Sequence, residues 1–74
     1  MKELVEHIVK AVVKHPDDVV VVEFDEQNEK VYEVVVNPED VGQVIGKDGR
    51  TIKAITDMVA TLTGRRGVSV RVVR

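Results

Sequence analysis

The segment most able to bind a ligand contains two glycines three residues apart, Gly46 and Gly49, followed by a helical pattern. Glycine has no Cβ, so a turn built on such a pair leaves its peptide groups open to a ligand. The first amides of the following helix have no partner within that helix, and they point with the positive end of its dipole into the turn. Lys47 lies in the turn, and Arg50 and Lys53 lie on the first helical turns. These groups predict a site for phosphates.

An apolar surface is expected beside this turn, because the apolar stripe of the following helix starts at Ile52. A phosphate-binding turn next to an apolar surface suits a single-stranded nucleic acid, whose phosphates and base faces must both be held. The alternative is that residues 46–49 only connect two helices. We expect Asp48 to cap the second helix and to point away from the phosphates. Its negative charge opposes that of Lys47 and predicts modest affinity.

The net charge of −2 conceals an uneven distribution along the chain. Residues 1–42 hold four Lys or Arg and eleven Asp or Glu, whereas residues 43–74 hold seven Lys or Arg and two Asp. Such asymmetry favours a basic binding face on the C-terminal part. The alternative is that the two halves mix in space and leave no basic patch.

Three helices are predicted along the chain from hydrophobic spacing and from start and stop signals, and the turn joins the last two. Apolar residues at helical spacing predict helices over residues 3–14 and 50–63, the first of them ended by the following proline. Asn37 as a cap and Pro38 at the first helical position predict the start of a short helix, which Gly46 ends. The glycine-lined turn therefore joins two helices.

Three strands are predicted over residues 19–24, 31–36 and 68–72, and the short polar connection between the first two indicates an antiparallel hairpin. The order helix, strand, strand, helix, helix, strand predicts an α+β fold with residues 1–74 as one domain. Nineteen of the 74 residues are valine, which favours a sheet as part of the core. The two aromatic residues, Phe24 and Tyr32, could stack on bases, but in a valine-rich sheet we expect them in the core.

Four more arginines lie near the C-terminus. Arg65 and Arg66, between two glycines, either extend the basic rim toward a second stretch of RNA or form a solvated turn. Arg71 and Arg74 are expected to face solvent on an edge strand, where charges prevent mispairing.

Several functional classes are excluded by what the sequence lacks. There is no cysteine, hence no disulfide, thiolate metal site or cysteine nucleophile. The longest purely apolar run, Val19–Val22, is far shorter than the roughly 20 residues of a membrane span. The segment Gly42–Asp48 is one residue short of a nucleotide-binding phosphate loop, and His7 and His15 lack metal-site spacing. We expect a cytoplasmic protein that is no enzyme and has no cofactor, metal, membrane or small-molecule substrate.

The string Ile45-Gly46-Lys47-Asp48-Gly49 between two helices resembles the signature loop of the KH domain. The resemblance covers essentially the whole chain, and residues 44–55 are similar to the small bacterial KhpA family. It implies the type II KH fold, a three-stranded mixed sheet packed on one side by three helices. The RNA-binding residues that follow from the turn and the resemblance are Ile45, Gly46, Lys47, Asp48, Gly49, Arg50, Ile52, Lys53, Arg65 and Arg66.

The same resemblance implies weakly specific binding of single-stranded RNA, RNA-chaperone activity, pairing with itself or with a KhpB-like partner, and links to cell division, cell shape and the cell envelope. Two alternatives remain open. The chain could be a protein-interaction module that dimerises through a sheet edge or an apolar helix face and has little affinity for RNA. Residues 38–63 could also form a helix-turn-helix DNA-binding motif, which the short first helix and the two glycines disfavour.

Overall fold

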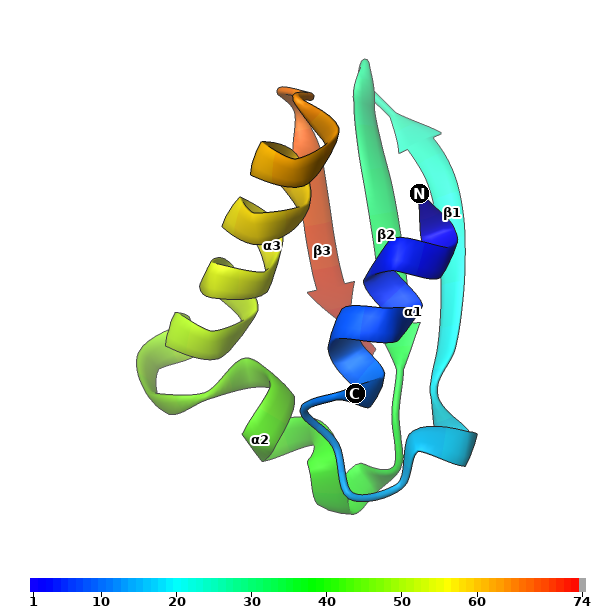
Figure 1. Cartoon of the computed structure of the whole chain (residues 1–74), viewed down its shortest axis with the longest axis vertical. Coiled ribbons are helices and arrows are strands. Elements are labelled where there is room, and N and C mark those ends of the chain that lie inside the picture. Colours follow the sequence, from blue (N-terminus) through cyan, green and yellow to red (C-terminus); the bar gives the residue numbers. More distant parts are fainter. Residues whose placement is uncertain (74) are drawn as a thin grey trace.

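The computed structural model describes residues 1–73 and consists of one three-stranded sheet with helices on a single face (Figure 1). Strand β2 lies in the centre, pairs antiparallel with β1 and pairs parallel with β3. The predicted α+β fold with a mixed sheet and three helices on one side is thus confirmed. The elements are α1 (Lys2–Lys10), β1 (Val20–Glu26), β2 (Glu29–Val35), α2 (Val41–Ile45), α3 (Arg50–Thr63) and β3 (Val68–Val72), with short 3-10 turns at Pro16–Asp18, Pro38–Asp40 and Lys47–Gly49.

The hairpin between β1 and β2 is tighter than predicted. Its turn consists of Gln27 and Asn28 alone, with φ of 49° and 67°. Positive φ at both central residues is typical of the two-residue turns whose twist matches that of the flanking strands. Pairing therefore continues to Glu26 and Glu29, and the polar stretch predicted as a loop belongs largely to the strands.

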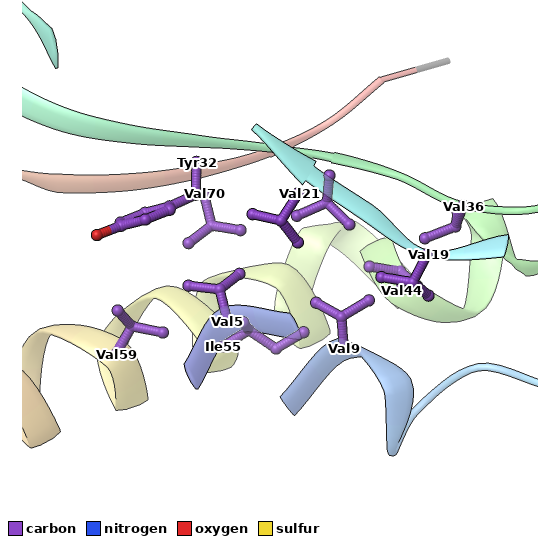
Figure 2. Close-up of a cluster of buried hydrophobic side chains, with 11 residues drawn as sticks. Val5, Val9, Val19, Val21, Tyr32, Val36, Val44, Ile55, Val59 and Val70 are labelled. Atoms are coloured by element: carbon purple, nitrogen blue, oxygen red, sulfur yellow. The ribbon is translucent and has the colours of Figure 1, made fainter. Parts of the chain in front are cut away.

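The core lies between the sheet and the helices and is made mostly of valine (Figure 2). Tyr32 is fully buried in this core, as predicted. Phe24 was also expected in the core, and this prediction is wrong. Phe24 pairs with Val31 on the face of the sheet that no helix covers, and it is half-buried there, because strand side chains alternate between the two faces. The core residues are Val5, Val9, Val19, Val21, Tyr32, Val34, Val36, Val44, Ile55, Val59 and Val70.

Helix α1 ends at Lys10, four residues before the predicted end. The backbone amides of Lys14 and His15, which would extend the helix, instead donate hydrogen bonds to the carboxylate of Asp40. A tertiary contact therefore ends the helix before the proline at position 16 can do so.

The short helix predicted to begin at Pro38 begins with a 3-10 turn at Pro38–Asp40, and α2 itself starts at Val41. Asn37 accepts a hydrogen bond from the amide of Glu39 at 2.9 Å, which confirms its capping role. Arg71 is exposed on β3, which is an edge strand as predicted, while Arg74 lies outside the described residues. No helix within residues 1–73 is long and apolar enough to cross a membrane.

Candidate nucleic-acid interface

The turn between α2 and α3 is held unusually close to the start of α3 at Gly46. This glycine has φ 77° and ψ 174°, a combination available essentially to glycine alone. A Cβ on Gly46 would lie 2.2 Å from Oγ1 of Thr51 and 2.8 Å from its backbone nitrogen. The glycine is therefore required both by its backbone conformation and by the approach of the turn to the helix. The role of Thr51 was not predicted, because nothing in its own sequence neighbourhood signals this contact.

The second glycine, Gly49, is required for a different reason. Its φ of 74° is left-handed, but an added Cβ would meet only Ile52, at 4.0 Å. Asp48 also stands in the left-handed region, with φ 57° and ψ 25°. The turn is thus tightly bent, and the amides of Gly49 and Arg50 donate hydrogen bonds to the carbonyls of Gly46 and Lys47 within it.

The prediction that Asp48 caps α3 is wrong. The capping position is taken by Gly49, and no side chain makes a hydrogen bond there. In its left-handed conformation Asp48 precedes the capping position, and its exposed carboxylate makes no hydrogen bond or ion pair within residues 1–73. Its charge is therefore present at the turn, next to Lys47.

Lys47, Arg50 and Lys53 are all exposed at the start of α3, and within the described chain none of them forms an ion pair. Two other cations are neutralised by partners. Lys30 contacts Asp25 at 3.0 Å and Glu23 at 3.3 Å, and the hydrogen bonds that its ammonium group donates to these carboxylates raise its pKa. Arg71 pairs with Glu26 at 2.9 Å. The cations at the turn are thus available to an external anion.

The apolar residues beside the turn are only partly buried. Ile45 and Ile52 flank it on α2 and α3, and both are half-buried, whereas Val44 is completely buried in the core. The structure thus brings together eight of the predicted site residues, from Ile45 to Arg50 with Ile52 and Lys53. They form one surface around the start of α3, which we call the loop surface.

Arg65 and Arg66 do not belong to the loop surface. They follow the C-terminal end of α3, whose 14 residues separate them from the turn by about 21 Å (Figure 1). Both are exposed. A Cβ added to the neighbouring Gly67 would lie 3.6 Å from Cγ of Glu29, so the arginines stand close to the hairpin. This pair therefore stands in an exposed turn next to the acidic hairpin, and its contact with a second stretch of RNA stays a prediction.

The acidic residues of the hairpin lie at the end of the sheet opposite the turn (Figure 1). Glu23, Asp25, Glu26 and Glu29 belong to β1 and β2 near their connection. These four acidic residues therefore do not lie beside the loop surface.

Comparison with known proteins finds a matching family model and relatives that cover nearly the whole chain. A family model described as "KhpA/KhpB, KH domain" matches residues 2–73. The chain is 59% identical over 75 residues to the RNA-binding protein KhpA of Thermotoga maritima, with all of both chains covered. It is 52% identical over 67 residues to that of Leifsonia xyli, covering 90% of this chain and 88% of the relative.

The fold recurs within a larger protein. A crystal structure of Aquifex aeolicus Era, a variant bound to GDP and an aluminium fluoride, superposes with a TM-score of 0.63 and 21% identity. The match covers 97% of this chain but 30% of the Era chain, so it shows the fold alone. Together with the full-length relatives and the family model, the geometry of the turn leads to one assignment. The chain belongs to the KhpA/KhpB family of KH domains, as the sequence resemblance predicted.

Proposed function

We propose that the chain binds single-stranded RNA at the loop surface. The observation that carries this proposal is the close approach of Gly46 to Thr51, which brings the turn with Lys47 and the start of α3 with Arg50 to one place. Lys47 in the turn and Arg50 at the start of α3 have no ion-pair partner in the described residues. The names of the full-length relatives as RNA-binding proteins support the same conclusion.

In this proposal the backbone amides and the three cations contact phosphates, while Ile45 and Ile52 contact base faces. Phosphate contacts carry no sequence information, so the specificity for base sequence is weak. Weakly specific binding suits an RNA chaperone in the cytoplasm, which must release one strand arrangement to permit another. Membership of this family of binding domains also confirms that the chain is not an enzyme.

The proposal is tested by titrating a labelled single-stranded RNA with the wild-type chain and with Lys47→Asp. Lys47 is exposed, so the variant keeps the fold, but its acidic side chain repels the phosphates and removes measurable binding. Lys2→Asp is the matched control, because it makes the same change of charge at an exposed position on α1. If two or three phosphates are neutralised, log K falls with log salt at a slope of about −1.5 to −2. Equal binding by Lys47→Asp and wild type would contradict the proposal.

A chaperone role is tested separately, with two complementary RNA hairpins whose annealing is followed by fluorescence. Wild type accelerates annealing, and Lys47→Asp does not. Competition between single-stranded RNA and duplex DNA distinguishes this function from DNA binding by a helix-turn-helix.

A second candidate function is association with another copy of the chain or with a KhpB-like partner. Met58 and Leu62 lie four residues apart on one side of α3 and are 47% and 63% exposed, so they form a neighbouring apolar pair at the surface. Light scattering after size-exclusion chromatography tests this: Met58→Glu should lower a dimeric mass to that of a monomer. Gln43→Glu, which adds a charge at an exposed position on α2, should not. RNA titration of the same samples shows whether association is the whole function.

A further inference from the structure

Asp40 stands at the capping position of α2 but does not cap it. An aspartate there usually accepts a hydrogen bond from an amide in the first turn of its own helix. The carboxylate of Asp40 instead accepts bonds from the amides of Lys14, at 3.1 Å, and of His15, at 3.0 Å. Asp40 is 1% exposed and is the buried charged residue of the described chain. Both of its oxygens are thus committed to a segment 25 residues earlier.

The helix that Asp40 starts cannot fix its own position. Helix α2 has five residues, barely more than one turn, and such a short helix has little stability by itself. Its placement must come from tertiary contacts at its two ends. Val44 is completely buried in the core near the C-terminal end, and the bonds of Asp40 fix the N-terminal end. The turn begins at Gly46, directly after this helix.

Two other contacts join the same two segments, and both are exposed. Nε2 of His15 lies 3.3 Å from Oε2 of Glu39, and the amide of the Asn37 side chain donates to Asp18 at 3.0 Å. Exposed contacts of this kind contribute little, because water and salt compete with them. Charge-assisted bonds to a buried carboxylate are stronger and more directional. The placement of α2 therefore depends on Asp40 among these contacts.

We propose that Asp40 is a positioning residue for the RNA site: it fixes α2 against the α1–β1 connection and thereby sets the geometry of the turn at Gly46. This inference rests on the proposed function. Asp40 is too deeply buried to touch RNA. Its effect on affinity passes through the orientation of α2 and the contact of Gly46 with Thr51.

The test compares Asp40→Ala and Asp40→Asn with two kinds of control. Glu39→Gln removes the charge from the neighbouring exposed contact at His15. Val9→Ala destabilises the core by creating a cavity at a residue of α1 that makes no hydrogen bond to Asp40. All variants are studied well below their melting temperatures, where each is fully folded. The readouts are the affinity for single-stranded RNA and, without RNA, the amide chemical shifts of Gly46 and Gly49.

We expect Asp40→Ala to weaken RNA binding by about three- to thirtyfold, the range found for residues that act on a site without touching it. The shifts of Gly46 and Gly49 change in the same variant. Asp40→Asn, which keeps one acceptor oxygen, has a smaller effect and provides the test if Asp40→Ala does not fold. Glu39→Gln and Val9→Ala keep wild-type affinity and wild-type shifts at the two glycines.

Wild-type affinity and unchanged glycine shifts in both Asp40 variants would show that Asp40 only stabilises the fold, and would overturn the inference. Loss of affinity in Val9→Ala to the same extent would overturn it too, since any destabilisation would then suffice. If wild type itself binds no RNA, the proposed function fails, while the glycine shifts still decide whether Asp40 positions the turn.

Discussion

Arg71 on β3 and Glu26 on β1 form an ion pair of 2.9 Å that crosses the central strand on the face of the sheet without helices. In the strand register Arg71 stands beside Glu33 and Glu26 stands beside Glu29. The residue of β2 between these two positions on this face is Val31, which is only 1% exposed although no helix covers it. We infer that the arginine side chain spans the position of Val31 and shields it from water together with Phe24, the partner of Val31 on β1.

The covering of Val31 predicts unequal effects of the two charge removals. Arg71→Ala uncovers the valine and should lower the free energy of unfolding by about 1 kcal/mol, because the stem of arginine buries apolar surface. Glu26→Gln leaves the stem in place and should cost less than about 0.5 kcal/mol, as is usual for an exposed ion pair. Urea unfolding measures both values. Equal costs would mean that the ion pair and not the covering of Val31 matters.

The two glycines of the turn should differ in what they tolerate. Gly49→Asn should fold and bind RNA nearly as wild type, because asparagine accepts left-handed dihedrals and the space around Gly49 is open. Gly46→Ala should lower the free energy of unfolding by more than about 2 kcal/mol, because its Cβ overlaps Thr51 in a tightly packed place. Chemical denaturation and RNA titration check the two variants. A Gly46→Ala variant as stable as wild type would show that the turn can move away from α3.

Asp48 should limit the affinity for RNA. Its carboxylate is exposed in the turn beside Lys47, and removal of its charge takes away a repulsion from the phosphates. Asp48→Asn keeps the left-handed conformation and should tighten binding about threefold at low salt, which corresponds to about 0.7 kcal/mol for unit charges ~6 Å apart in water. The gain should shrink as salt rises, because exposed charges are screened. Weaker binding by this variant would mean that the carboxylate contacts the RNA favourably.

The buried hydroxyl of Tyr32 should make the stability of the fold decrease at alkaline pH. Its hydroxyl is buried without a hydrogen-bond partner in the described chain, and burial raises its pKa above the usual value of about 10. The folded state then holds the proton more tightly than the unfolded state. The corresponding stability is fully present below about pH 10 and is lost as the pH rises further.

Tyr32→Phe separates this effect from that of lysines, which lose their protons in the same range. The variant removes a buried hydroxyl without a partner, so at neutral pH it should be as stable as wild type or more stable by about 1 kcal/mol. Its stability should decrease less above pH 10 than that of wild type. Thermal unfolding between pH 7 and pH 11 measures both effects. A clear loss of stability at neutral pH would indicate that the hydroxyl has a bound water as its partner.

Much of the fold could be predicted from local signals. Asn37 and Pro38 start a helix, Gly46 ends one, and hydrophobic spacing defines α3 to the residue. These signals act within one or two turns of chain, so they can be read without knowing what lies nearby in space. The early end of α1 could not be predicted, because Asp40 from a distant segment captures the amides that would have continued it.

The candidate site divides in the same way. The sequence by itself determined that the turn carries two glycines with Lys47 between them and Arg50 after them, and that an apolar helix face begins beside it. Only the tertiary structure decided that Gly46 touches Thr51 and that the second pair of arginines stands at the far end of α3. The physical reason is the distance along the chain over which each kind of interaction acts. Backbone preferences and side-chain spacing are set by neighbours along the chain, whereas contacts and separations across the molecule depend on how the elements pack.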